Sequence, residues 1–165
     1  MSRYNKNLGN LGETIAATYL KNNHYKILEH NFNIYGGEID LVAQKNDEII
    51  FIEVKTRIQS EYYPQPTDII SPKQRRTLIN TGKIWLISRL NLDPMNIYWQ
   101  IDVISIILKK NGTIVSLKHF VNAIYWFANE IGGPLAQLVE QRAFNPRVAG
   151  SSPARLTIYE IVPLL

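Results

Sequence analysis

Charged side chains on two neighbouring segments of this chain could do chemistry together. Glu53 and Lys55 are two positions apart in an apolar segment, a spacing that puts both side chains on one face of a strand. Glu38 and Asp40 have the same spacing in the preceding segment. A short hairpin between residues 41 and 51 would bring Asp40 beside Glu53. The sequence therefore predicts that two carboxylates and one amine converge.

Two carboxylates at that separation would repel each other, and the repulsion would raise the pKa of one of them. A divalent cation removes this repulsion, and hard oxygen ligands suit Mg²⁺ or Mn²⁺. We therefore predict that Asp40 and Glu53 bind the cation. Such an ion would polarise a phosphoryl oxygen and activate water in phosphodiester hydrolysis, while Lys55 would orient that water and offset negative charge.

Part of this pattern has an ordinary alternative. A Glu-x-Lys pair on a strand most often forms a solvated face with a weak ion pair. The second segment favours the functional interpretation, because Glu38 and Asp40 alternate with apolar residues, among which a charge is costly without a partner.

The spacing of apolar residues predicts the elements that would position these side chains. Ser71 and Pro72 favour the start of a helix at that point. The expected order is a helix over residues 8–23, strands over 25–32, 38–44 and 48–56, a helix over 72–90, and strands over 97–108 and 113–120. This order predicts an α/β fold with a mixed central sheet of about five strands flanked by helices.

Length and composition limit the classes of protein to consider. The chain has 165 residues and a net charge of +4, enough for one domain and a tail. It has no cysteine, which excludes disulfides, thiolate metal sites and cysteine nucleophiles and suits a reducing compartment. Neither a secretory signal nor an apolar run of about 18 residues is present. We therefore expect a cytoplasmic protein without a membrane partner.

Basic residues near the acidic segments are candidates for contacts with a nucleic acid. Arg57 follows Lys55 on the same predicted strand, and Lys73, Arg75 and Arg76 open the second predicted helix. We predict that these four side chains bind phosphates, the alternative being an ordinary charged outer helix face.

Several other residues have structural interpretations. Glu13 is a candidate fourth catalytic residue, but an acid near a helix start would also suit the helix dipole. The histidines lack metal-ligand spacing and are expected to be structural or exposed, and the tryptophans are expected to pack in the core or at its edges. These residues are His24, His30 and His119, and Trp85, Trp99 and Trp126.

Motifs between residues 5 and 126 carry a family resemblance. They are Asn10-Leu-Gly-Glu13, Gly37-Glu-Ile-Asp-Leu41, Phe51-Ile-Glu-Val-Lys-Thr-Arg57, Pro72-Lys-Gln-Arg-Arg76, Ile101-Asp-Val103 and His119-Phe-Val-Asn-Ala123. The set resembles the YraN family of endonuclease-like bacterial proteins, which is similar to PD-(D/E)xK nucleases and archaeal Holliday junction resolvases. Two positions depart from the family pattern: Gln100 stands where the family usually carries arginine, and the loop Tyr62-Tyr-Pro64 lacks the usual glycine.

The resemblance implies a restriction-endonuclease-like domain over residues 1–127. It assigns Asp40 and Glu53 as metal ligands, Lys55 as the catalytic lysine and Glu13 as a further acid, with Glu38 and Gln74 in secondary roles. It also implies a Mg²⁺- or Mn²⁺-dependent nuclease whose partner is DNA, branched DNA included. Cleavage of a DNA junction that has two-fold symmetry would suit a homodimer.

Two rival functions stay open at this point. One is a module on the same fold that binds nucleic acid or docks without catalysis. The other is a structural α/β domain with no nucleic-acid partner, for which DNA retention would fail at any salt concentration.

The composition changes from Gly132 onward, and we expect residues 128–165 to be a tail and not a domain. Residues 135–141 can be encoded by CTA GCT CAG TTG GTA GAG CAG, the usual D-arm sequence of a transfer RNA gene. Residues 150–153 fit a T-arm in the same way, and the 25 residues from Gly133 to Thr157 correspond to about the length of one such gene. The hypothesis is that translation reads through a downstream tRNA gene. The alternative is a true accessory segment.

Overall fold

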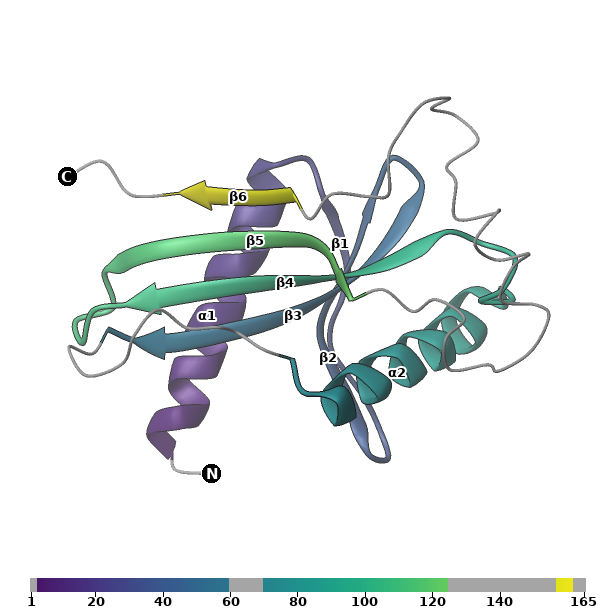
Figure 1. Ribbon diagram of the computed structural model, residues 1–165, viewed down its shortest axis with the longest axis horizontal. Coiled ribbons are helices and arrows are strands. Elements are labelled where there is room, and N and C mark those ends of the chain that lie inside the picture. The colour runs from purple at the N-terminus through teal and green to yellow at the C-terminus, as the bar shows by residue number, and fades with distance from the viewer. Residues whose placement is uncertain (1–2, 60–69, 125–156, 162–165) are drawn as a thin grey trace.

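In the part of the chain that the structure describes, two helices and a six-stranded sheet make up the fold (Figure 1). The computed structural model describes residues 3–59, 70–124 and 157–161, and the expectations for residues 62–64, Trp126 and 128–156 lie outside them. The helices are α1 (Arg3–Asn22) and α2 (Pro72–Leu90). The strands are β1 (Lys26–Ile34), β2 (Gly37–Lys45), β3 (Glu48–Ile58), β4 (Trp99–Leu108), β5 (Ile114–Ile124) and β6 (Thr157–Ile161).

The strands lie side by side in chain order, β1-β2-β3-β4-β5-β6. All neighbours are antiparallel except β3 and β4, which run parallel and are separated in the sequence by α2, as parallel strands require a long crossover. This confirms the predicted α/β fold with a mixed sheet, and the architecture is consistent with a restriction-endonuclease-like fold. The five predicted strands are present, and β6 is a further strand that the sequence analysis did not predict.

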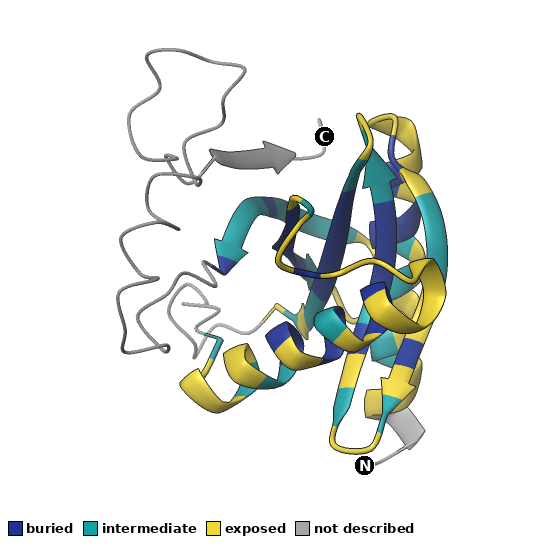
Figure 2. Ribbon diagram, turned by 90° about the vertical axis from the view of Figure 1, so that its right-hand side faces the viewer, coloured by how far each residue is buried: buried dark blue, intermediate teal, exposed yellow. Residues whose placement is uncertain are grey.

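The two helices cover opposite faces of the sheet, and buried residues line the central strands between them (Figure 2). Alternate residues of β3 face different helices, so that Ile52 belongs to the apolar cluster under α1 and Phe51 to the cluster under α2. Each core therefore depends on the period-two alternation of the strands. Trp85 and Trp99 are buried in the α2 cluster, which confirms their predicted packing role.

Tight turns hold the first three strands together as the predicted meander. Asn46 and Asp47, between β2 and β3, have φ values of 48° and 66°. Positive φ at both central positions is typical of a type I′ hairpin turn, for which Asn and Asp are favoured. This turn brings the acidic part of β2 back against β3.

Helix α1 begins at Arg3, five residues before the predicted start at Leu8. Glu13 therefore lies in the middle of a 20-residue helix and not near its first turn. The interpretation of Glu13 as a partner of the helix dipole is wrong, because that effect is confined to the terminal turns.

Gly12 lets α1 approach β3 closely. A Cβ atom at this position would lie 1.7 Å from the Thr56 Oγ1 atom, whereas a Cβ atom at Gly9 of the same helix would meet nothing within 4 Å. Gly12→Ala is therefore expected to lower the free energy of unfolding by about 1–3 kcal/mol through overpacking. Gly9→Ala, the matched control, is expected to raise it by up to about 1 kcal/mol through helix propensity. Urea unfolding followed by circular dichroism measures both, and equal effects would contradict the close packing.

A buried polar network lies on the α1 face of the sheet. The Asp102 carboxylate bonds His119 Nε2 at 2.8 Å and accepts hydrogen bonds from Gln100 Nε2 and the Asn122 amide. The Tyr19 hydroxyl lies 3.3 Å from His119 Nδ1. His119 is 1% exposed, so its predicted structural role is confirmed. Gln100, the departure from the family pattern, supplies one donor to this network.

Candidate active site between β2, β3 and α2

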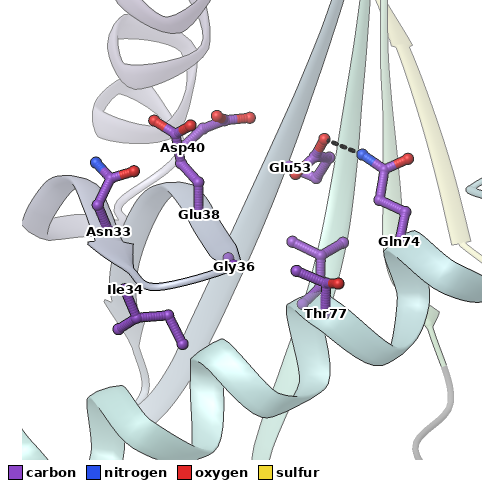
Figure 3. A pocket seen from close by; sticks show the side chains of 10 residues that line it. Asn33, Ile34, Gly36, Glu38, Asp40, Glu53, Gln74 and Thr77 are labelled. Carbon is purple, nitrogen blue, oxygen red and sulfur yellow. Dashed lines mark hydrogen bonds between the residues drawn. The ribbon is translucent and has the colours of Figure 1, made fainter.

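A pocket of about 400 Å³ opens between the β1–β2 hairpin, β3 and the start of α2 (Figure 3). Glu38 and Asp40 of β2, Glu53 of β3 and Gln74 of α2 line it with polar atoms. The remaining lining residues are Asn33, Ile34, Gly36, Gly37, Thr77 and Leu78. Asp40 and Glu53, the predicted metal ligands, thus border the same pocket, as the geometry of the hairpin predicted.

The pocket forms where β2 separates from β3. Leu41 and Ile52 are the last paired residues at this end of the ladder. Asp40 directly precedes Leu41 on β2, and Glu53 directly follows Ile52 on β3. The Val54 amide, beyond the end of the ladder, donates a 2.6 Å hydrogen bond to Asp40 Oδ2. The Asp40 side chain therefore satisfies a backbone donor that the β2 backbone no longer reaches.

Glu53 is held by residues from two elements. It is 8% exposed, and its Oε1 atom accepts hydrogen bonds of 2.6 Å from both Lys55 Nζ and Gln74 Nε2. Lys55 comes from the same strand face, as the two-residue spacing predicted. Gln74 comes from the first turn of α2, which Ser71 caps by accepting a hydrogen bond from the Gln74 amide. The capped start of α2 thereby positions Gln74, and Gln74 in turn holds the Glu53 carboxylate in place.

The acidic side chains around Asp40 destabilise its charged form. Burial and then the negative charge of Glu53, with smaller contributions from Glu13 and Glu38, raise the pKa of Asp40 to about 7, although the hydrogen bond from the Val54 amide lowers it. A carboxyl with a pKa near 7 carries a full charge at neutral pH only at a free-energy cost. The site thus gathers more negative charge than its own protein donors neutralise.

The donors fit a hard divalent cation with few protein ligands. Over residues 3–59 and 70–124, no cluster of three or more His, Asp or Glu side chains is arranged to hold an ion. Mg²⁺ does not need such a cluster, because it is commonly bound by one or two carboxylates and keeps several waters. The carboxylates of Asp40 and Glu53 meet that requirement, and the raised pKa of Asp40 reflects first its burial and then the repulsion from Glu53, which an ion would relieve.

The other predicted site residues lie at different distances from this centre. Glu13 is half-buried on α1 and does not line the pocket, but its charge contributes to the raised pKa of Asp40. Arg57 is exposed on β3, two residues beyond Lys55, and is also outside the pocket lining. The structure therefore brings Asp40 and Glu53 together in the pocket. Lys55 is outside the pocket lining but bonds Glu53, whereas Glu13 and Arg57 lie at the margin.

The three predicted basic residues of α2 are exposed in its first turns. Lys73 and Arg75 flank Gln74, whose side chain enters the pocket, and Arg76 follows them. The basic residues thus share the first turns of α2 with Gln74. Their position is compatible with phosphate contacts there.

Sequence reasoning missed most of the contacts made by α2. Gln74 was assigned only a secondary role, although it binds Glu53 directly, and Thr77 was not singled out. The motif Pro72-Lys-Gln was the one signal that could have found Gln74. Asn33, from β1, reaches the pocket only because the β1–β2 hairpin folds beside α2, for which the sequence offers no local signal.

Comparisons with known proteins agree with the resemblance. The profile described as "Uncharacterised protein family UPF0102" matches residues 12–106. A UPF0102 protein of Geobacter metallireducens is 42% identical over 123 residues, which cover 74% of this chain and 96% of that protein. A UPF0102 protein of Clostridium botulinum is 39% identical over 119 residues, covering 72% and 94%. Neither described helix is long and apolar enough to span a membrane.

Proposed function

The chain belongs to the uncharacterised protein family UPF0102, the YraN family, and we propose that its pocket is the active site of a metal-dependent nuclease that hydrolyses DNA phosphodiesters. The observation that carries the proposal is the pair Asp40 and Glu53, which line one pocket from two adjacent strands, with the pKa of Asp40 raised to about 7. Perturbed carboxylates in a cleft are a frequent property of catalytic sites.

In this proposal the carboxylates of Asp40 and Glu53 hold Mg²⁺ or Mn²⁺. The bound cation would supply Lewis-acid stabilisation of charge on the phosphoryl oxygens. Lys55 contributes a positive charge at the edge of the same site, 28% of its side chain being exposed. Gln74 orients Glu53 through its side-chain amide, and Glu13 adds negative charge that favours cation binding.

DNA is the proposed substrate because exposed basic residues lie in the first turns of α2, the element that supplies Gln74 to the acidic pocket. Lys73, Arg75 and Arg76 lie exposed at the start of α2, where they can contact phosphates on either side of a scissile bond. Branched DNA is the structure that the family resemblance favours. The proposal places the protein in the cytoplasm, where this DNA is found in bacteria.

A second candidate function is DNA binding without cleavage on the same fold. Glu53 is already bonded to Lys55 and Gln74, and the described residues offer no third acidic or histidine ligand in a metal-binding arrangement. Both facts suit a pocket that keeps its charged residues but does not cleave DNA. Incubating the protein with branched, single-stranded and duplex DNA in Mg²⁺ or Mn²⁺ separates the two functions. Metal-dependent cleavage supports the nuclease, and retention of DNA that is never cut supports the binding module.

Replacing Lys73 and Arg75 with glutamine tests the proposed DNA surface. We expect weaker binding of all DNA sequences alike and a slope of log affinity against log salt that is shallower by about 2, because each lost phosphate contact removes nearly one released counterion. Lys109→Gln with Lys110→Gln, in the exposed turn between β4 and β5, is the matched control. Fluorescence anisotropy over a salt series measures both, and an equal change in the control would rule out a localised surface.

A further inference from the structure

The pocket between β2, β3 and α2 is larger than a bound cation requires. Its volume is about 400 Å³, within the range of roughly 300–1,000 Å³ that is typical of sites for small organic ligands. Water occupies about 30 Å³ per molecule in the liquid, so a Mg²⁺ ion with four waters would fill roughly a third of the pocket. Space therefore remains beside Asp40 and Glu53 for a part of the substrate.

The remaining space suits an uncharged group better than a phosphate. None of the described residues that line the pocket is basic, and Glu38 adds a third acidic side chain to the lining. A phosphate that lay away from the cation would therefore be repelled. The parts of a DNA strand that carry no charge are its sugars and its bases.

The lining between the β1–β2 hairpin and α2 has the mixed character that a nucleobase requires. Ile34 of the hairpin and Thr77 of α2 lie on opposite sides of the pocket, and Leu78 adds apolar surface (Figure 3). The Asn33 amide nitrogen donates a 2.7 Å hydrogen bond to the Asn31 carbonyl oxygen, which leaves the Asn33 Oδ1 atom as an acceptor toward a ligand. Apolar surface with a few polar groups is typical of sites that bind flat, uncharged ligands.

Tyr35 adds an aromatic ring at the tip of the same hairpin. Its chain neighbours Ile34 and Gly36 both line the pocket, whereas the Tyr35 side chain is fully exposed. The ring therefore does not contribute to the core. Exposed aromatic rings bind unpaired bases by stacking, and this interaction needs no particular base sequence.

We propose that the pocket receives an unpaired nucleotide beside the scissile phosphate, with its base between the β1–β2 hairpin and α2 and the next base stacked on Tyr35. This inference rests on the proposed function, because it names the DNA that the same site takes. In a continuous duplex every base is paired and stacked, so a base enters the pocket only after costly unstacking. The site therefore selects DNA with unpaired nucleotides, at a gap, a flap or a branch point, over continuous duplex.

Binding of gapped DNA tests this inference without requiring cleavage. The probe is a fluorescent duplex with a short single-stranded gap, and the reference is the same gap built from abasic residues, which keeps every phosphate. Fluorescence anisotropy in Ca²⁺, a hard cation that also takes oxygen ligands, gives both affinities. We expect the wild type to bind the gap that contains bases roughly 10²-fold more tightly, because two bases gain contacts that contribute about tenfold each.

Two variants locate the two bases. Tyr35→Ala removes the exposed ring and Thr77→Leu fills the pocket, so each is expected to lower the affinity for the gap that contains bases roughly tenfold. Neither should change the affinity for the abasic gap. Tyr35→Phe keeps the ring and should bind like the wild type. Tyr98→Ala, which removes another exposed tyrosine outside the pocket lining, is the matched control. If Thr77→Leu does not fold, Asn33→Leu at an exposed position replaces it.

Equal affinities of the wild type for the two gaps would overturn the inference. So would an unchanged preference in either Tyr35→Ala or Thr77→Leu, or an equal loss in Tyr98→Ala. Cleavage assays in Mg²⁺ separate these outcomes from failure of the proposed function. Equal cleavage of gapped and continuous DNA would leave a nuclease without the base site, whereas a preference for bases without any cleavage would support the base site on a protein that only binds DNA.

Discussion

If the proposed nuclease function is right, Glu53→Gln is expected to reduce metal-dependent DNA cleavage by roughly 10³-fold or more, because it removes one of the two carboxylates proposed to hold the cation. The glutamine side chain has the same shape and can still accept hydrogen bonds from Lys55 and Gln74, which bind Glu53 at 2.6 Å. The loss would therefore come from charge and not from packing. DNA affinity in the absence of metal is expected to stay the same or increase, because a negative charge is removed beside the DNA.

The matched control is Glu48→Gln, on the same strand. Glu48 does not line the pocket. Its pKa is raised by burial and by the negative charge of Asp102, which lies on the face of the sheet opposite the pocket. Single-turnover cleavage of a labelled branched DNA in Mg²⁺ compares the two variants. Equal rates for Glu53→Gln and Glu48→Gln would contradict the proposed active site and favour the DNA-binding module.

Asp40→Asn is expected to stabilise the metal-free protein at neutral and alkaline pH. The pKa of Asp40 rises from 3.8 to about 7 on folding, so between these pH values the folded state binds more protons than the unfolded state. Stability then falls as the pH rises from about 4 to 7 and stays low above 7. Asparagine carries no charge and avoids this loss. At about 1.4 kcal/mol per pKa unit, we expect the variant to gain about 2–4 kcal/mol at pH 8 and almost nothing below pH 4.

Urea unfolding from pH 4 to pH 8, with and without Mg²⁺, tests this prediction. Mg²⁺ should stabilise the wild type more at pH 8 than at pH 6, because the ligand carboxylate must be deprotonated to bind it. It should not stabilise Asp40→Asn. A wild type whose stability relative to the variant does not change with pH would show that Asp40 ionises normally, and the repulsion argument for a cation would be lost.

Local sequence patterns determined most of the secondary structure. The α2 boundaries, the meander and the shared face of Glu53 and Lys55 follow from capping residues, turn residues and the two-residue period of a strand, which act over a few positions. The start of α1 was misplaced, because residues 3–7 are polar and give no apolar period, although they continue the helix. The family resemblance added the assignment of Asp40 and Glu53 as one site.

Tertiary structure alone decided how that site is completed. The bond from Gln74 to Glu53 spans 21 residues, and the bond from Val54 to Asp40 arises where two strands separate, so neither has a local signal. The Asp102–His119 pair and the pairing of β6 with β5 also join residues that are far apart in sequence. Spacing along the chain specifies which side chains share a face, because that depends on backbone geometry. Which faces then meet depends on how all the elements pack, which is a property of the whole fold.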